Sequence, residues 1–335
     1  MFISLIVIAH DRREYLLDAL SSVTNQNLDK QKYEVIVVKN FEDSLIDSYI
    51  TNRQIHKILC KSPGLGSKIA AGVIEAKGDV ITFLEDDDLF EPERLKYVFD
   101  SFLANQELIY FHNSFSQYDA KLNPIAQQKF RHVEKPLLLT SSQIDENILN
   151  QTFTNSIHAN LSSIAIKKYI LNQALQILVK TNGGEDLSFF LLSLERQGQL
   201  FFTEHKLTKV RIHDSFFTNN SIKLGNEKLL WKIKRHQNYL NTYRLMLPLL
   251  TKIGFDWLLR FSWKKAIFIN ILSSEKNEYL SLNKLFSLIF TFIKRKNWTD
   301  VFLCSLILIR KPFLHFSMIM HFPDPMLKLI EIFSP

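Results

Sequence analysis

The chain has 335 residues, of which 46% are hydrophobic and 22% are charged, and it contains only 9 glycines and 9 prolines. This composition excludes a disordered, collagen-like or low-complexity protein, and the length allows one large domain or two smaller ones with a buried core. Two cysteines are too few for a disulfide scaffold or a cysteine-rich zinc site, which indicates a reducing compartment.

The formal net charge of +7 is unevenly distributed along the chain. Residues 221–335 contain 18 Lys and Arg against 7 Asp and Glu, whereas residues 1–220 contain 23 basic and 27 acidic residues. Such an asymmetry favours two functions on one chain. We therefore expect one domain over residues 1–222 and a basic, apolar-rich helical region over residues 223–335.

Short apolar runs alternate with a helical pattern at the start of the chain. Residues 3–9, 35–38 and 80–84 are predicted strands, and residues 15–23 are predicted to form a helix with one apolar face. Strands separated by helices pair in parallel through right-handed crossovers, so we expect an α/β sandwich. Ligands of such sheets bind at the carboxyl ends of the strands, which places residues 9–11, 39–40 and 85–88 on one edge.

The pattern is looser after residue 104. The further predicted elements are strands at residues 108–111, 155–166 and 207–212, a turn at 119–123, and an apolar-faced helix at 187–196. From about residue 226, apolar residues recur at spacings of three and four, which is typical of helices.

Four consecutive carboxylates, Glu85, Asp86, Asp87 and Asp88, directly follow the third predicted strand. They would repel one another strongly unless a cation neutralised them, and their hard oxygen ligands suit Mg²⁺ or Mn²⁺ with diphosphate oxygens completing the shell. The alternative is a solvated acidic turn before the helix that starts near Pro92, because the helix dipole favours carboxylates there. From these residues alone both interpretations stay open.

Two later segments carry further candidate groups. Asp186 follows two glycines and a glutamate and precedes a predicted helix, so it could cap that helix or serve as a general base. His213 follows the last predicted strand, where it could be structural, bind a metal through a ring nitrogen, or contact a phosphate. The nearby Arg211 offers a guanidinium group that suits phosphate.

The glycines of residues 64–68 (GLGSK) are only superficially similar to a dinucleotide-binding loop. They precede a helix and then a strand, whereas that fingerprint follows a strand and needs a third glycine at a fixed spacing. An NAD site is therefore not expected, and the Walker pattern is absent from the sequence.

The order and spacing of these segments resemble the inverting family 2 glycosyltransferases of GT-A fold, over roughly residues 2–220. Residues 4–12 (SLIVIAHDR) are similar to the family's first strand and nucleotide-contacting turn, and residues 15–23 (YLLDALSSV) with Gln26 to its first helix. Residues 64–72 and 76–79 resemble the approach to the Asp-x-Asp strand, and residues 86–88 with Pro92 resemble that motif. Residues 184–186 with Gly198 look like the family's Glu-Asp element, and residues 211–213 like its late element that contacts metal or diphosphate.

The resemblance implies a Rossmann-like sandwich with a mostly parallel central sheet, a nucleotide-sugar site in residues 1–104 and an acceptor side in residues 105–222. It implies that Asp186 deprotonates an acceptor hydroxyl, which attacks the anomeric carbon and inverts its configuration. It also implies a Mg²⁺ or Mn²⁺ ion at Asp87 or Asp88, with His213, that stabilises the leaving nucleoside diphosphate. The implied donor-binding residues are Ala9, His10, Asp11, Arg12, Asn40, Lys68, Asp86 and Arg211.

The sequence departs from the family pattern at three places. Residues 39–40 (Lys-Asn) stand where an Asp often contacts the base, residues 69–70 (Ile-Ala) stand where an Arg-Asn pair is frequent, and Glu85 replaces the usual Asp. Lys68 is adjacent to the second departure and could take over a phosphate contact. The nucleotide base of the donor is therefore not specified by these residues.

The tail couples basic clusters to apolar bulk. Its apolar runs at residues 255–263, 285–293 and 301–309 are each followed by Lys or Arg, and none reaches the roughly 20 residues that cross a bilayer. Such clusters beside Trp and Phe favour attachment to an anionic membrane surface. The alternatives are a helical subdomain packed on the first domain or a homodimer interface. Nucleic acid is not an expected partner, because the chain has no recognition motif for it.

We therefore predict a metal-dependent, inverting glycosyltransferase that transfers a hexosyl or hexosaminyl group from a nucleotide sugar to a hydroxyl of a lipid-linked glycan or polysaccharide. We expect it in the cytoplasm, peripherally associated with the inner face of the cell membrane. A polyprenyl-phosphate sugar synthase is the nearest alternative enzyme. A non-catalytic nucleotide-sugar-binding or membrane-associated interaction protein is the alternative from another class.

Overall fold

The computed structural model describes residues 1–125, 133–143, 148, 152, 157–213, 237–239, 241–242 and 244–249. The chain divides into two compact units, Met1–Ser262 and Trp263–Pro335, and every described residue belongs to the first. The predicted domain boundary near residue 222 and most of the basic region 223–335 lie outside the described residues, so both stay predictions.

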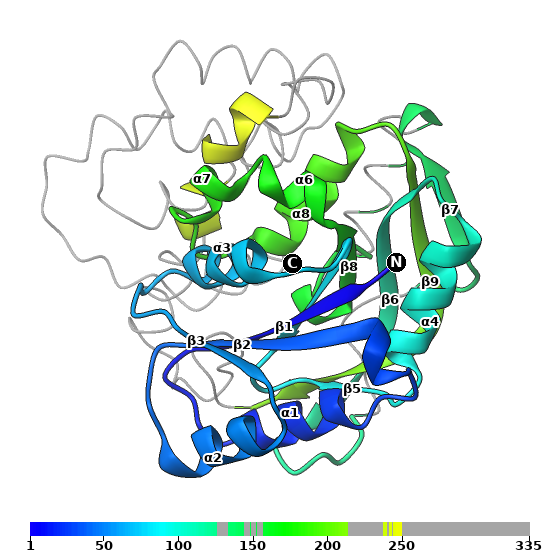
Figure 1. Cartoon of the computed structure of the whole chain (residues 1–335). Coiled ribbons are helices and arrows are strands. Elements are labelled where there is room, and N and C mark those ends of the chain that lie inside the picture. Colours follow the sequence, from blue (N-terminus) through cyan, green and yellow to red (C-terminus); the bar gives the residue numbers. More distant parts are fainter. Residues whose placement is uncertain are drawn as a thin grey trace, which may run out of the picture. The chain divides into compact units, whose positions relative to one another are not determined.

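The first half of the sheet consists of parallel strands joined by helices (Figure 1). Its order is β3 (His56–Leu59), β2 (Tyr33–Lys39), β1 (Ile3–Ala9) and β4 (Val80–Glu85). Every residue of β1 is buried, because helices cover both faces of this strand. This half has the parallel pairing that the apolar runs predicted.

The second half of the sheet is mixed. β8 (Ile164–Lys167) runs antiparallel between β4 and β6 (Leu108–Asp119), while β9 (Gln199–Ile212) runs parallel to β6. β5 (Leu89–Phe90) and β7 (Leu137–Thr140) pair antiparallel with β9. In the described part of the chain, all strands join one nine-stranded sheet in the order β3-β2-β1-β4-β8-β6-β9-β5, with β7 attached to β9. The predicted α/β fold class is confirmed.

Helices pack on both faces of the sheet (Figure 1). One face carries α1 (Leu16–Thr24), α2 (Ser44–Asn52) and α4 (Arg94–Ala104), whose apolar residues share a core with Leu5 and Val7 of β1. The other face carries α3 (Leu65–Glu75), α6 (Lys168–Asn172), α7 (Leu175–Leu178) and α8 (Glu185–Leu194), whose core includes Ile6 and Ile8. Alternate residues of β1 thus serve opposite cores, as the two-residue period of a strand requires.

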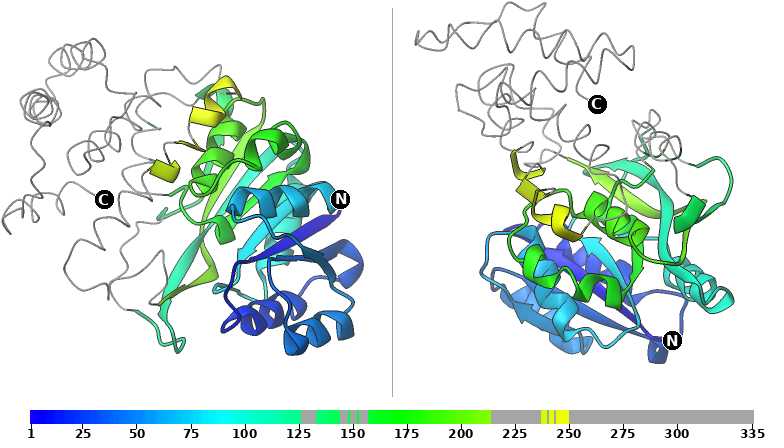
Figure 2. Two further views of the ribbon diagram at one scale, coloured as in Figure 1. Left: turned by 90° about the vertical axis from the view of Figure 1, so that its left-hand side faces the viewer. Right: turned by 90° about the horizontal axis from the view of Figure 1, so that it is seen from above.

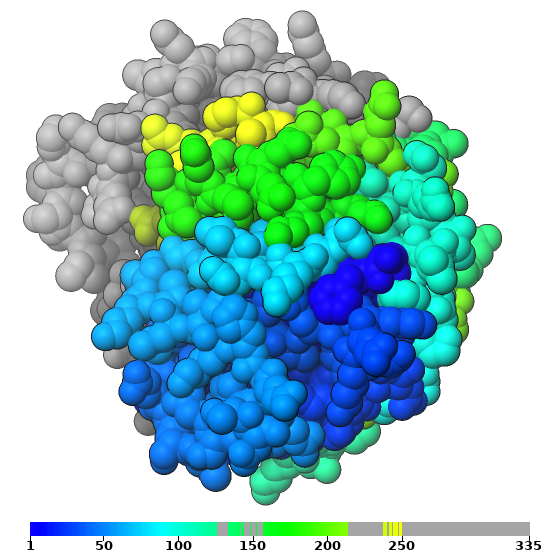
Figure 3. All heavy atoms as spheres, in the orientation of Figure 1, coloured from blue at the N-terminus to red at the C-terminus, as the bar shows by residue number. Residues whose placement is uncertain are grey.

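A short part of the predicted tail packs on the same core. Residues 237–239, 241–242 and 244–246 are helical, and Met246 is 1% exposed within the core beneath α3 and α8. Figures 2 and 3 show these residues in yellow beside the green α6 to α8 segment. For this stretch the packing favours the alternative of helices that belong to the first domain.

Several elements differ from the sequence-based prediction. Among the described residues of the strand expected at 155–166, only residues 164–166 are extended, as part of β8, because a 3-10 turn, η3 (Leu161–Ser163), precedes them. α8 begins and ends two residues earlier than predicted, and β9 begins eight residues earlier. The unpredicted elements include α2, β3, β5, β7 and the 3-10 turns η1 (Lys30–Lys32), η2 (Ser141–Gln143) and η4 (Leu247–Leu249). No helix among the described residues has the length and apolar character needed to span a membrane.

Candidate active site

The carboxyl ends of β1, β2 and β4 meet on one edge of the sheet, as predicted. The register pairs Ala9 with Lys39 and Ile8 with Glu85. The amide of His10 donates to Asp86 Oδ2 at 3.0 Å, which joins the end of β1 to the acidic segment, residues 85–88. This edge therefore gathers backbone and side-chain polar groups from three strands.

Asp11 and Asn40 hold the turn after β1. The Asp11 amide donates to Asn40 Oδ1 at 2.9 Å, and Asn40 Nδ2 donates to Asp11 Oδ1 at 2.8 Å. Asp11 has a φ of +58°, a left-handed conformation that Asp tolerates better than most residues. The two residues fix the chain direction that leads to Arg12.

Arg12 lies against the acidic segment. Its Nη2 is 2.7 Å from Asp86 Oδ1 and its Nη1 is 2.6 Å from Asp87 Oδ2, so one guanidinium group spans two neighbouring carboxylates. The same Nη1 is 2.9 Å from His213 Nε2. Arg12 thus supplies the positive charge that this run of acidic residues needs. The contact of Arg12 with the donor, which the family resemblance implies, stays a prediction.

Burial disfavours the charged form of all four carboxyl groups, but their pKa values differ. It raises the pKa of Asp86 to about 7, with the negative charge of Asp87 adding to the rise and Arg12 opposing it. Burial and the Asp87 charge also raise the pKa values of Glu85 and Asp88 well above the usual range. Burial acts on Asp87 in the same way, but the hydrogen bond with His213 and the charge of Arg12 outweigh it and lower the Asp87 pKa. Asp87 is therefore the carboxylate of this segment that most readily stays ionised.

His213 returns to the acidic segment from the end of β9. Its Nε2 lies 2.9 Å from Asp87 Oδ2, and its ring packs against Tyr15 with centroids 4.8 Å apart. A carboxylate and an imidazole at this separation are a donor set that suits a divalent cation. Among the described residues, however, no group of three or more His, Cys, Asp or Glu side chains is arranged to hold a metal. These residues fit the predicted ion as a two-ligand site that needs further oxygen ligands.

Asp88 and Arg211 join β9 to the acidic segment. Asp88 is 3% exposed and its Oδ1 accepts the Arg211 amide at 3.1 Å. The Arg211 guanidinium donates to the Asp87 carbonyl at 3.0 Å and pairs with Asp18 at 2.9 Å, while it stacks over Tyr15. The described contacts of Arg211 are thus structural, and its predicted contact with the donor stays a prediction.

Lys68 and His10 lie near the same edge. Lys68 is completely buried in α3, and its Nζ donates to the Ser62 carbonyl at 2.8 Å. Burial lowers the pKa of Lys68, against the opposing charges of Cys60, Asp11 and Asp86. Burial also lowers the pKa of His10, and the charge of Lys68 adds to that effect. The charge of Lys68 thus acts on the first residue after β1.

Gly66, in the first turn of α3, serves packing. A Cβ at Gly66 would lie 2.0 Å from Thr181 Oγ1 and 2.1 Å from the Leu178 carbonyl. Only glycine allows α3 to approach the end of α7 this closely. The close packing explains why a glycine stands at position 66.

Asp186 lies in the first turn of α8 and is half-buried. Its Oδ1 accepts the Leu187 amide at 2.8 Å, and its Oδ2 accepts the Asn160 amide at 3.2 Å. The preceding Glu185 is buried instead, and both of its carboxylate oxygens accept the Gly183 amide at 2.9 Å. Of the two acidic residues, Asp186 is thus the one with access to a substrate, and Glu185 holds the glycine turn.

The turn that contains Asn160 connects the acidic segment, residues 85–88, to Asp186. This turn was not predicted from the sequence. The Glu85 amide donates to Ser162 Oγ at 3.1 Å, and the Ser162 amide donates to Asn160 Oδ1 at 2.9 Å. The Asn160 amide completes the chain of contacts by donating to Asp186. The only available signal was an Asn-x-Ser sequence, which the alternating pattern had assigned to a strand.

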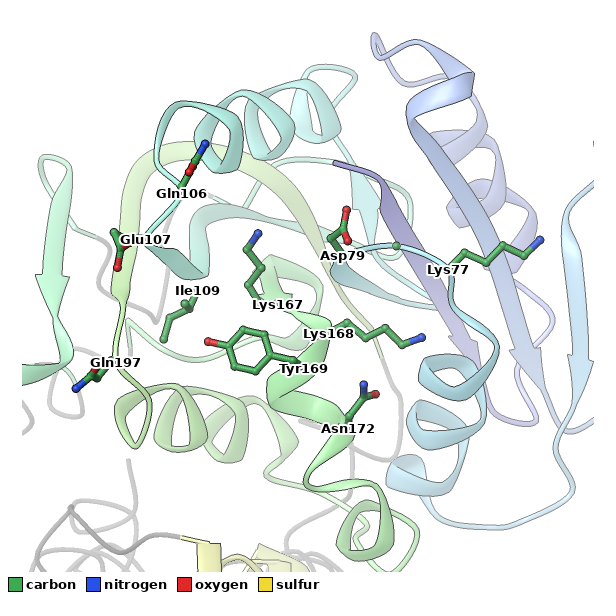
Figure 4. Close-up of a pocket in the computed structure, with 11 residues that line it drawn as sticks. Lys77, Asp79, Gln106, Glu107, Ile109, Lys167, Lys168, Tyr169, Asn172 and Gln197 are labelled. Atoms are coloured by element: carbon green, nitrogen blue, oxygen red, sulfur yellow. The ribbon is translucent and has the colours of Figure 1, made fainter.

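A surface cavity of about 630 Å³ lies away from these groups (Figure 4). It is lined by residues from the start of β4, the end of β8 and the first turn of α6, including Lys77, Asp79, Lys167, Lys168 and Tyr169. Because β4 runs from this cavity toward Glu85, the cavity and the acidic segment lie at opposite ends of this strand. The cavity therefore does not belong to the candidate active site.

Known structures share the fold of this chain. S. aureus TarS 1-349 in complex with UDP superposes with a TM-score of 0.54 at 14% identity, covering 86% of this chain and 78% of that chain. The same protein in complex with UDP-GlcNAc superposes with a TM-score of 0.54 at 13% identity, covering 95% of this chain and 93% of that chain. At these identities the likeness concerns the fold.

Sequence comparison gives the family. A glycosyltransferase of Haemophilus influenzae, described as uncharacterized, is 24% identical over 227 residues, which are 65% of this chain and 70% of that protein. The family model described as Glycosyl transferase family 2 matches residues 4–167, a range that covers β1 from its second residue through β8 and contains the acidic segment. The chain belongs to the family 2 glycosyltransferases and has their GT-A fold.

Proposed function

We propose that this glycosyltransferase is metal-dependent and inverting, and that it transfers a hexosyl or hexosaminyl group from a nucleotide sugar to a hydroxyl of a lipid-linked glycan or polysaccharide. The observation that carries the proposal is the hydrogen-bonded turn that joins the acidic segment to Asp186. It supports a donor site and a base held at a fixed separation. The fold it shares with TarS, solved with UDP and with UDP-GlcNAc, supports a nucleotide-sugar donor.

On the donor side, the proposal uses the residues at the ends of β1, β4 and β9. A Mg²⁺ or Mn²⁺ ion held by Asp87 and His213 would add positive charge next to the leaving nucleoside diphosphate. Arg12 neutralises Asp86 and Asp87 when no donor is bound, and its long side chain can also reach toward a diphosphate. Lys68 is a second basic group near this edge.

On the acceptor side, Asp186 is the proposed base. Two backbone amides hold its carboxylate, one on each oxygen, so its orientation is fixed before the substrate arrives. The carboxylate accepts the proton of the acceptor hydroxyl while that oxygen attacks the anomeric carbon opposite the diphosphate. One displacement of this kind inverts the configuration of the transferred sugar.

The basic tail supports a location as well as a reaction. We infer that the Lys and Arg clusters of residues 263–335 bind the anionic inner face of the cell membrane, where lipid-linked acceptors are found. Full-length protein should co-sediment with vesicles that contain anionic lipid and not with neutral vesicles. Equal recovery with both kinds of vesicle would contradict the membrane role and favour the homodimer alternative, which sedimentation in solution would detect.

A binding screen tests the proposed donor chemistry. Calorimetry with UDP, GDP, CDP, ADP and dTDP, each with and without Mn²⁺, should find one nucleotide bound preferentially and more tightly with the ion. It also identifies the base. If none of the five nucleotides binds under either condition, the proposed donor site is wrong.

A further inference from the structure

Asn160 has a backbone conformation that non-glycine residues rarely adopt. Its φ is +86° and its ψ is 110°, outside the regions that are sterically comfortable for a residue with a Cβ. Such conformations persist when the surroundings hold them in place, and they concentrate at functional sites. A glycine would adopt this backbone conformation with less strain. The presence of the Asn160 side chain therefore suggests that it has a function.

Two polar groups of Asn160 have hydrogen-bond partners, and a third has none among the described residues. Its backbone amide donates to Asp186 Oδ2 at 3.2 Å, and its Oδ1 accepts the Ser162 amide at 2.9 Å. Its Nδ2 is buried and has no hydrogen-bond partner among the described residues. Buried donors in proteins are nearly always paired, so an orphaned one suggests a partner that is absent from the free protein.

The position of this amide indicates what the partner is. Ser162 ties the turn to the Glu85 amide at the start of the acidic segment, while Asn160 itself contacts Asp186. The turn therefore lies between the group that faces the leaving diphosphate and the group that faces the acceptor hydroxyl. In a displacement at an anomeric carbon, the transferred sugar occupies the space between these two.

We propose that Asn160 recognises the transferred sugar, with its Nδ2 donating a hydrogen bond to a hydroxyl or acyl oxygen of that sugar. Its backbone amide meanwhile keeps Asp186 oriented, so one residue couples the position of the sugar to the position of the base. This assignment rests on the proposed function, because it requires a sugar-nucleotide donor.

Two substitutions remove the amide donor in different ways. Asn160→Asp keeps the size of the side chain and the oxygen that accepts the Ser162 amide, whereas Asn160→Gly removes the side chain and keeps the positive φ. An effect common to both variants is therefore due to Nδ2. Asn172→Asp, at an exposed position in α6, is the matched control.

The measurement is the affinity of each variant for UDP and for UDP-GlcNAc with Mn²⁺, by calorimetry, or for the matching pair if the screen selects another base. Both Asn160 variants should bind the nucleotide sugar about tenfold more weakly, or about 1.4 kcal/mol. Their affinity for the free diphosphate should equal that of the wild type, and the control should bind both ligands normally.

Four outcomes would overturn the assignment. Equal weakening of both ligands would mean that Asn160 only supports the fold of the site. Unchanged affinity for the nucleotide sugar would mean that Nδ2 does not contact it, as would a wild type that gains no affinity from the sugar. A wild type that binds none of the nucleoside diphosphates would contradict the proposed function, and this assignment with it.

Discussion

The acidic segment at residues 85–88 and the pair Glu185 and Asp186 place the same kind of side chain at the site in different surroundings. In the first, four carboxyl groups are crowded at a strand end, and a guanidinium and an imidazole compensate them. In the second, backbone amides hold each carboxylate separately. The chemistry available to a carboxylate therefore depends on the groups next to it. Crowded carboxylates favour the binding of a cation, and contacts with backbone amides fix the orientation of a base.

Within the crowded segment, the largest expected effect comes from removing its ionised member. Asp87→Asn should lower sugar transfer about 100-fold or more, because the leaving diphosphate loses the charge held by Asp87 and His213. The Mn²⁺ dependence of nucleotide binding should disappear with it. Calorimetry and a transfer assay measure both, and a variant that keeps its Mn²⁺ response would remove Asp87 from the cation site.

The crowding should also appear as a pH dependence of stability. The pKa of Asp86 is about 7 in the folded protein and near 4 in the unfolded chain, so between these values the unfolded chain binds fewer protons. The stability of the metal-free protein should therefore fall as the pH rises from about 4 to about 7. Thermal unfolding between pH 5 and pH 8 measures the slope.

Asp86→Asn should make that slope shallower, because the substituted side chain does not ionise. Asp186→Asn is the control, since amide contacts rather than crowding hold that carboxylate. A slope in Asp86→Asn identical to that of the wild type would contradict the account of crowding.

The amide-held pair should respond to Glu185→Gln through stability. Both carboxylate oxygens of the buried Glu185 accept the half-buried Gly183 amide, and one of them becomes an NH₂ group that cannot accept. We expect a loss of about 1–3 kcal/mol in the free energy of unfolding. Urea denaturation measures it against Glu75→Gln, an exposed position in α3 that should stay near the wild type.

A smaller effect should follow from removing the internal cation. Arg12 spans Asp86 and Asp87, so it competes with a divalent ion when no nucleotide is bound. Arg12→Ala should bind Mn²⁺ alone about tenfold more tightly, or about 1.4 kcal/mol. Arg13→Ala, whose contacts are Asp43 and the Phe41 ring, is the control. Equal Mn²⁺ affinity in the two variants would mean that Arg12 does not occupy the cation site.

The sequence predicted the parts of the fold in which burial follows a simple rule. β1 and β4 are buried on both faces and therefore form continuous apolar runs. β3 was not predicted because it is an edge strand with mostly exposed residues, and β5 was not predicted because it is only two residues long. Edge strands of this kind leave no apolar pattern to detect.

The part of the site that could be predicted consists of residues that come at or directly after the ends of strands. Residues 9–12 and 85–88 could be placed on one edge because parallel strands end together. The meeting of Asp87 with His213 came from a resemblance and not from spacing. The role of Asn160 could not be predicted, since its backbone conformation exists only in the folded chain, as does the burial of its Nδ2 without a partner among the described residues.

Asp186→Asn tests most directly whether donor binding depends on one acidic segment and proton removal on the other. With the donor and acceptor that the wild type uses, turnover should fall about 10²- to 10⁴-fold while the donor dissociation constant stays within about twofold. A variant that turns over like the wild type, or one that loses donor binding and turnover together, would contradict the separation of the two roles.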